Sequence, residues 1–355
     1  MQSDTSKRIF FADLLKGIAV LLMVQVHVME QFASPGVIES WLGKISLFLG
    51  GPACAPVFLM LMGYFIGRSR WKPAGLVKRG FQLFFLGIVL NIARSVNLLI
   101  QIWQGNIFLD PFFFIFGADI LTLAGLSCIV LPLVYWLLKK NFIAYFILAL
   151  CLSLLSGFVP DIFSEGSIGK YFEAFFTGNA SWSYFPFLPW FSYVIVGFAF
   201  NMFQNSNIKV PEIKGSLLLF AALVCIAFVP FAWNVATDLN GEYGYYHHDI
   251  RFFLWTMAFM LFYLWFVKLV SDKFIENFIF QRLVFIGKNV TLFYVIQWII
   301  IGNIATEIYQ TQTGTGFIIW SLLVFLLSYA ATRLVLVLTK RFRENNWILG
   351  RVKKV

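Results

Sequence analysis

Charge is scarce in this sequence: 12% of its 355 residues are charged, against roughly 25% in soluble chains. Hydrophobic residues instead make up 60%, including 43 Phe, 13 Tyr and 12 Trp. A globular protein of this length has too little interior to bury so much apolar side chain. The composition therefore excludes a soluble enzyme, a secreted disulfide scaffold and a disordered chain. It predicts a polytopic integral membrane bundle made only of α-helices.

Cysteine and histidine are also few, with four Cys and three His. Each cysteine lies within an apolar run, and none has the spacing of a disulfide framework or a zinc site. Adjacent His247 and His248 face different ways and make a poor metal pair. We therefore expect no metal and assign the cysteines to packed positions: Cys54, Cys128, Cys151 and Cys225.

Ten runs are long enough to cross a bilayer, which requires about 20 apolar residues of helix. The first contains Asp13 and Lys16 and has no clear cleavage site after it, so we interpret it as a retained helix rather than a signal peptide. The chain has no internal repeat and no long linker, which predicts a single domain over residues 1–355. The runs cover residues 9–30, 46–67, 79–101, 112–138, 142–160, 187–204, 215–233, 250–269, 284–304 and 316–338.

The net charge of +10 has a topological explanation. With ten spans and a cytoplasmic N-terminus, most Lys and Arg residues fall on the cytoplasmic side and most acids outside, as the positive-inside rule requires. The pattern predicts cytoplasmic termini at both ends of a multi-pass protein of the bacterial inner membrane. The lipid bilayer is then its main partner, and binding to nucleic acid is not expected.

Ionisable side chains inside the predicted spans cost several kcal/mol each and usually face a polar cavity. Lys16 and His27 are eleven residues apart, about three helical turns, so they share one face at roughly 16 Å along the axis. Asp13 lies within one turn of Lys16. This arrangement suits chemistry across the membrane, and an interfacial ion pair with an interface histidine fits equally well.

The third run carries a polar stripe of Asn91, Arg94, Asn97 and Gln101 on one helical face. Arg94 lies near the expected depth of His27, and Asp119 in the fourth run is a candidate partner. The pair either stabilises an oxyanion or binds an acceptor, or it holds the bundle together. Both interpretations stay open.

Outside the membrane, residues 243–251 form the densest polar and aromatic cluster, with His247, His248, Asp249 and Arg251. Aromatic rings stack on sugars and charged groups bind hydroxyls, so this cluster suits a glycan. Trp182, Tyr184 and Trp190 suit either the mouth of such a site or, preferably, an interfacial aromatic belt.

Asp13-x-x-Lys16-Gly-x-Ala followed by His27 resembles the opening helix of the transmembrane acyltransferase superfamily. That superfamily includes the type-3 membrane acyltransferases, with an Arg-x10-His signature, and the heparan-α-glucosaminide N-acetyltransferase-like proteins. Four later segments resemble the latter branch, in the right order. This chain departs from the usual pattern in having Lys16 for Arg, Asp119 near a frequent Gln, and Gln297 where the late segment often ends in His. The four segments are Gly51–Gly63, Ala118–Leu126, Phe187–Gly197 and Ile286–Tyr294.

The resemblance implies acyl transfer from cytoplasmic acetyl-CoA to an extracytoplasmic sugar hydroxyl or amine, which would modify carbohydrate of the cell envelope. His27 would be the general base, with Arg94 and Asp119 also catalytic. CoA phosphates need cations, and the cofactor-binding candidates are the basic residues Lys16, Arg68, Lys78, Arg79 and Arg333, together with Asp13 beside Lys16. The substrate-binding candidates are Asn91, Trp190, His247, His248, Asp249, Arg251, Tyr294 and Gln297.

Two other classes remain as alternatives. A secondary transporter for an anionic metabolite or lipid-linked sugar would also use intramembrane charges, although no matching pair of interrupted helices indicates an inverted repeat. A flippase or ligase of the envelope would make His27 incidental. The acceptor, the acylated atom and the oligomeric state, including a homodimer, stay open at this stage.

Overall fold

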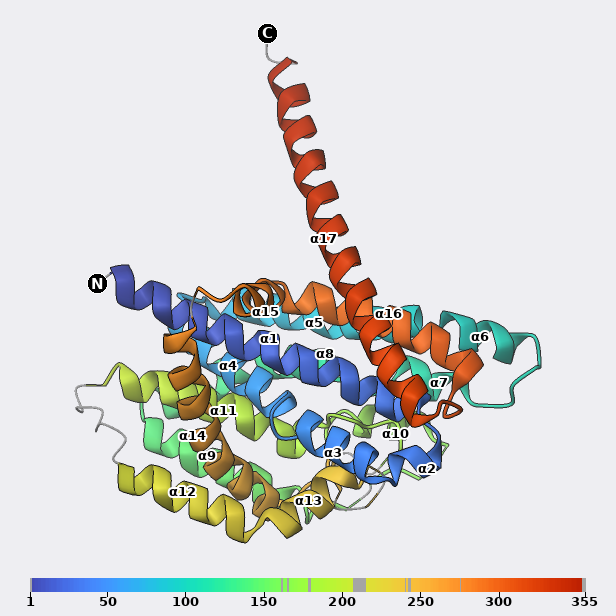
Figure 1. Ribbon diagram of the computed structural model, residues 1–355. Coiled ribbons are helices and arrows are strands. Elements are labelled where there is room, and N and C mark those ends of the chain that lie inside the picture. The colour runs from blue at the N-terminus through green and yellow to red at the C-terminus, as the bar shows by residue number, and fades with distance from the viewer. Residues whose placement is uncertain are drawn as a thin grey trace.

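The computed structural model describes residues 2–160, 162–164, 166–177, 180–206, 215–239, 241, 244–274 and 276–352, with side chains described from Phe10 to Phe342 within these ranges. These residues form an all-α bundle, as the composition predicts (Figure 1). Its helices are α1 (Gln2–Phe32), α2 (Pro35–Ile38), α3 (Trp41–Gly50), α4 (Ala55–Arg68), α5 (Pro73–Arg94), α6 (Val96–Trp103), α7 (Pro111–Ile115), α8 (Ile120–Leu138), α9 (Phe142–Leu155), α10 (Ile168–Glu173), α11 (Phe187–Gln204), α12 (Gly215–Ala227), α13 (Val229–Thr237), α14 (Ile250–Lys273), α15 (Phe278–Lys288), α16 (Val290–Ile308) and α17 (Gly314–Val352).

Among the described residues, eight helical segments are long and apolar enough to cross a membrane. The bent pair α12 and α13, with 61° between its helices, makes a ninth candidate where the sequence predicts a single run at 215–233. The chain is a multi-pass membrane protein. The predicted run at 142–160 is shorter in the structure, because α9 ends at Leu155 and Gly157 and Pro160 follow.

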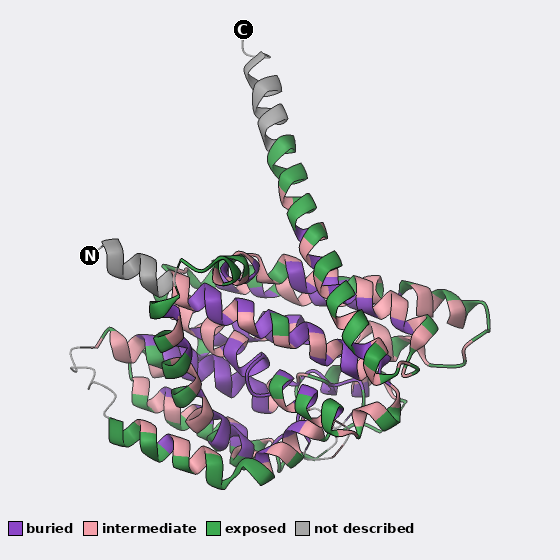
Figure 2. Ribbon diagram, viewed as in Figure 1, coloured by how far each residue is buried: buried purple, intermediate pink, exposed green. Residues whose placement is uncertain are grey.

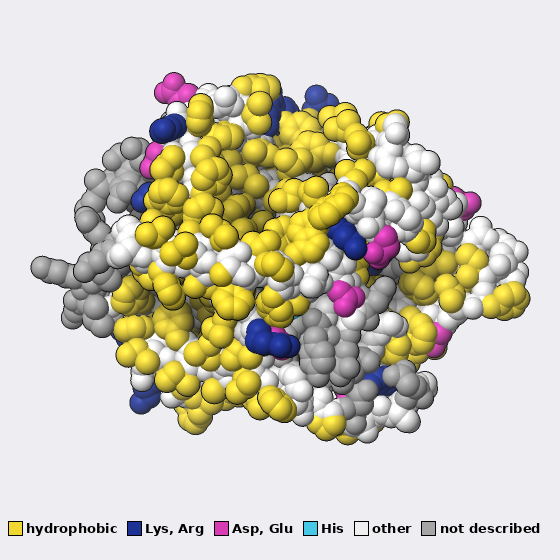
Figure 3. Space-filling model, turned by 60° about the horizontal axis from the view of Figure 1, so that its bottom comes forward, with side chains coloured by type: hydrophobic (Ala, Val, Ile, Leu, Met, Phe, Trp, Pro, Cys, Tyr) yellow, Lys and Arg dark blue, Asp and Glu magenta, His cyan; other side chains and the backbone are white. Residues whose placement is uncertain are grey.

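Many of the side chains on the outer surface of the bundle are apolar. Buried residues lie where the helices meet, and exposed residues lie mostly on the periphery (Figure 2). Hydrophobic side chains cover much of the face in Figure 3, and charged ones are scattered. Phe85, Trp136, Phe220 and Leu322 are among the large exposed apolar residues. In water such a surface would be costly, so it is the surface that faces lipid.

Two helix crossings depend on glycine. A Cβ built on Gly287 of α15 would overlap the carbonyl oxygen of Asp13 in α1, and one on Gly197 of α11 would overlap the carbonyl oxygen of Met60 in α4. Backbones can approach this closely only where no side chain intervenes, as is typical of membrane helices. These crossings fix α1 and α4 in the centre of the bundle, where Figure 1 places them.

Two breaks in helices position the polar groups. Residues 51–54 are buried and not helical, and they separate α3 from α4 inside a single predicted run. Ser95 separates α5 from α6, so Arg94 ends α5 and the predicted polar stripe is divided between two helices. Asn97, beyond the break, bonds to Asn303 and Glu307 of α16.

Candidate active site

His27 lies near the C-terminal end of α1 and contacts α16. Its Nδ1 is 2.9 Å from Nε2 of Gln297, and its ring lies 4.2 Å from the ring of Trp298 at 35°. The guanidinium of Arg94 lies over the ring of Trp298 as well, 4.6 Å from its centroid. Three helices, α1, α5 and α16, therefore fix the position of the imidazole.

Arg94 and Asp119 form the intramembrane pair that the sequence suggests. Nη1 of Arg94 is 3.0 Å from Oδ2 of Asp119, and the two side chains are 11% and 5% exposed. Tyr294 donates its hydroxyl to the second carboxylate oxygen. Asp119 also caps α8, where Thr122 completes a capping box. These contacts hold the Asp119 carboxylate in a fixed orientation.

The segment before Asp119 is held by backbone hydrogen bonds. Ala118 donates to the carbonyl of Trp182 and accepts from Tyr184 and Phe185. Asn91, a predicted substrate-binding residue, is fully buried and donates to the carbonyls of Ile115 and Gly117 instead. Asn91 thus positions the segment that carries Asp119, because a buried amide must satisfy its donors locally.

Glu30 is a site residue that the sequence pattern does not single out. It lies one turn after His27 in α1, and Tyr246 donates a 3.0 Å hydrogen bond to its carboxylate. The i, i+3 spacing from His27 was the available signal for it. Trp298, next to Gln297, was missed as well, since an aromatic residue in a span has no distinctive pattern.

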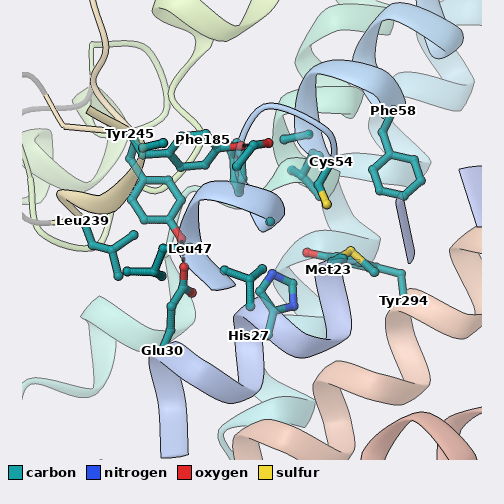
Figure 4. A pocket seen from close by; sticks show the side chains of 17 residues that line it. Met23, His27, Glu30, Leu47, Cys54, Phe58, Phe185, Leu239, Tyr245 and Tyr294 are labelled. Atoms are coloured by element: carbon teal, nitrogen blue, oxygen red, sulfur yellow. Dashed lines mark hydrogen bonds between the residues drawn. The ribbon is translucent and has the colours of Figure 1, made fainter. Parts of the chain in front are cut away.

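Two cavities meet at His27 and Glu30, which line both. The larger has a volume of about 360 Å³, and its polar lining includes Arg94 and Asp119. The smaller, shown in Figure 4, has a volume of about 40 Å³ and is lined mainly by apolar side chains together with Tyr294. His27 and Glu30 therefore belong to the wall between the larger cavity, called the vestibule here, and the smaller one, called the chamber. The aromatic side chains lining the vestibule are Phe114, Tyr184, Phe185, Tyr246, Trp298 and Tyr309.

The predicted CoA-binding residues lie outside both cavities. Lys16 Nζ is 2.6 Å from Oδ1 of Asp13, which confirms the predicted pairing, and it lies 5.6 Å from the ring of Phe65. The remaining four are exposed: Arg68, Lys78, Arg79 and Arg333. Arg68 ends α4 and Lys78 and Arg79 lie early in α5, so the chain direction brings them to the end of the bundle where α1 begins.

The structure does not bring the predicted histidines of the outer cluster to either cavity. His248 is fully buried, with Nδ1 2.8 Å from the carbonyl of Tyr245 and Nε2 2.9 Å from the hydroxyl of Tyr193. Its neutral form fits these two partners, and burial lowers its pKa to about 4. Burial also lowers the pKa of His247 to about 4. His248 therefore packs the loop rather than presenting a binding surface.

The other members of that cluster have structural contacts too. Trp190 is fully buried and donates its indole N–H to the carbonyl of Tyr246, so it is neither at a mouth nor in a belt. Asp249 caps α14 and pairs with Arg251 at 2.6 Å. The cluster reaches the site through Tyr245 and Tyr246 instead. The sequence predicts a binding surface here because a run of polar and aromatic residues does not show which side chains face inward. Tyr243 of the predicted cluster lies outside the described residues.

A histidine held by an amide and an aromatic ring, beside a buried Arg–Asp pair and between two cavities, is an arrangement suited to acid–base chemistry on a substrate. Within the described residues, no group of three His, Cys, Asp or Glu side chains could hold a metal ion.

Comparison with known protein families agrees with a site for acid–base chemistry on a substrate. Residues 9–337 match the family described as an acyltransferase domain, Acyl_transf_3. The match covers most of the chain, from α1 into α17, so this protein belongs to the type-3 acyltransferase family and is a membrane-bound acyltransferase. No curated protein and no solved structure matches the chain significantly.

Proposed function

We propose that the protein moves an acetyl group from cytoplasmic acetyl-CoA to a hydroxyl or amine of an extracytoplasmic sugar, with His27 as the general base. The observation that carries the proposal is the position of His27 in the wall between the vestibule and the small chamber. An acceptor in the vestibule and an acyl group in the chamber would meet at its ring. The sugar acceptor agrees with the resemblance to the heparan-α-glucosaminide branch.

In the proposed reaction, a ring nitrogen of His27 takes the proton of the acceptor O–H or N–H as that atom attacks the thioester carbonyl. A C–O or C–N bond forms, the C–S bond breaks, and the proton on His27 passes to the departing CoA sulfur. The new negative charge on the carbonyl oxygen requires donors. Arg94 has five N–H groups and uses only part of them on Asp119.

Gln297 has the role of setting the tautomer of His27. For Nε2 to accept a proton, Nδ1 must carry its own hydrogen and donate it. The amide oxygen of Gln297 is buried and has no partner among the described residues, whereas its nitrogen faces Nδ1. A half-turn of the amide, which exchanges these two atoms, would place the oxygen against Nδ1–H. Gln297 and Tyr294 are then positioning residues rather than substrate ligands.

Sidedness follows from the same proposal. Lys16 and the exposed basic residues at the ends of α4 and α5 would attract the CoA phosphates at the cytoplasmic mouth, where the charge attraction is weakened by salt. Both termini would be cytoplasmic, in a single domain of the bacterial inner membrane.

Purified protein incubated with acetyl-CoA and sugar acceptors tests the activity through release of free thiol. We expect turnover in the unchanged protein and a loss of at least about 100-fold in His27→Ala, the usual range for a general base. The melting temperature of the variant should be retained. Full turnover in folded His27→Ala would rule out the general-base role, and uptake of a labelled sugar into vesicles without acyl transfer would favour a transporter.

A further inference from the structure

The small chamber beside His27 has features of its own that go beyond the proposed reaction. We propose that it is the acyl subsite and that Met23, Cys54 and Phe58 limit the transferred group to two carbons. This inference rests on the proposed function, since it names the part of the donor that the chamber holds. Figure 4 shows these three side chains together on one side of His27, with Glu30 and Leu239 on the other.

The lining of this part of the chamber suits a methyl group. Met23 and Cys54 are 6% and 4% exposed, and Phe58 packs against two hydrophobic clusters of the bundle. The thiol of Cys54 donates to the carbonyl of Ala19 at 3.2 Å, so this polar group is already satisfied. An apolar wall without free donors favours a hydrocarbon end over a sugar hydroxyl, which would lose its hydrogen bonds there.

The size of the chamber determines which acyl group it can accept. Its volume is about 40 Å³, enough for a few water-sized groups, each of which needs roughly 10–15 Å³. A cavity of this size suits the short acetyl group better than a longer acyl chain. The vestibule, at about 360 Å³, is the cavity with room for a sugar. The two volumes thus separate donor acyl group from acceptor.

The walls are too well supported to widen easily. Met23 comes from α1 and Phe58 from α4, while Cys54 belongs to the break between α3 and α4. Tyr245 lines the same chamber and donates its hydroxyl to the carbonyl of Gly51 at 2.9 Å. Because packed interiors resist added methylene groups, a longer acyl chain should be rejected rather than accommodated.

The test compares acetyl-CoA, propionyl-CoA and butyryl-CoA as donors for purified protein and its variants, at a fixed acceptor concentration. One methylene in a hydrophobic pocket changes kcat/KM by roughly 10- to 200-fold. We expect the unchanged protein to prefer acetyl-CoA over butyryl-CoA by at least about 100-fold over two methylenes. Met23→Ala should raise the butyryl-to-acetyl ratio at least about tenfold, whereas Met23→Leu, which conserves volume, should keep acetyl preference.

Met260→Ala is the matched control. Met260 is a buried methionine like Met23, at 2% exposure, but it belongs to α14 and lines neither cavity. Its removal should leave the donor ratio unchanged. Phe58→Leu provides an enlargement from another helix, so the test still decides if Met23→Ala does not fold.

The outcomes separate the two proposals. No transfer from any acyl-CoA by the unchanged protein would overturn the proposed function. Transfer of acetyl and butyryl groups at equal rates would overturn only the acyl subsite. The subsite would also be overturned if neither Met23→Ala nor Phe58→Leu moved the ratio beyond that of Met260→Ala.

Discussion

Neutralising either member of the Arg94–Asp119 pair should destabilise the protein more than neutralising both. The two side chains are 11% and 5% exposed, so a single change leaves its partner charged and poorly hydrated. Breaking a buried pair in this way costs about 3–5 kcal/mol. Arg94→Gln and Asp119→Asn preserve much of the shape, and Asn still caps a helix well.

The double variant should lose much less than the sum of the single losses. Its remaining cost comes from one hydrogen bond, about 1 kcal/mol, and from the contact of Arg94 with the ring of Trp298. That cation–π contact is worth about 0.5–2 kcal/mol. The coupling energy should therefore exceed the additivity error of about 0.5 kcal/mol several times over.

The assay is a double-mutant cycle on melting temperature and on turnover, in the same detergent. The exposed pair Lys44–Glu39, at 3.2 Å with side chains 38% and 74% exposed, is the control, and its coupling should stay below about 1 kcal/mol. If Arg94 also stabilises the oxyanion, the double variant melts near the unchanged protein yet remains inactive. Additive stability losses would refute the reasoning, because they would mean that neither charge depends on the other.

Three further predictions concern other parts of the molecule. Lys16→Ala and Arg79→Ala should weaken acetyl-CoA binding by a factor that shrinks as salt rises, as titration calorimetry at two ionic strengths would measure. Equal weakening of acceptor binding would contradict the proposal that CoA and acceptor bind on opposite sides of the membrane. Burial lowers the pKa of His248 from 6.5 to about 4, so the unfolded chain binds more protons than the folded one between these pH values. Stability should therefore fall as pH drops from 6.5 towards 4, by an amount on the order of 3 kcal/mol. A melting temperature independent of pH over that interval in the unchanged protein, or a pH dependence that is no flatter in His248→Phe, would count against this prediction. Gly287→Ala should lower the melting temperature through a cost of about 1–3 kcal/mol, because its Cβ meets the backbone of α1, whereas Gly75→Ala, which meets nothing within 4 Å, should not.

Much of the helical framework is predictable from the sequence because the information is local. Apolar runs of sufficient length identify the spans, and the 3.6-residue period places Lys16 and His27 on one face of α1. The pair of Lys16 with Asp13 is predictable for the same reason, since residues three apart on a helix are neighbours. Where breakers interrupt a run, as after Leu155 and between α12 and α13, the predicted lengths and the count of ten spans are less accurate.

By itself the sequence determined the class of the protein and the chemistry-bearing residues of single helices. Only the tertiary structure decided which of them meet, because a polar group inside a membrane must find a partner but any facing helix can supply one. It joined Arg94 of α5 to Asp119 at the start of α8, and brought Trp298 and Tyr246 against the α1 residues His27 and Glu30. The same packing buried His248, where the hydroxyl of Tyr193 on α11 and the nearby carbonyl of Tyr245 satisfy its two ring nitrogens.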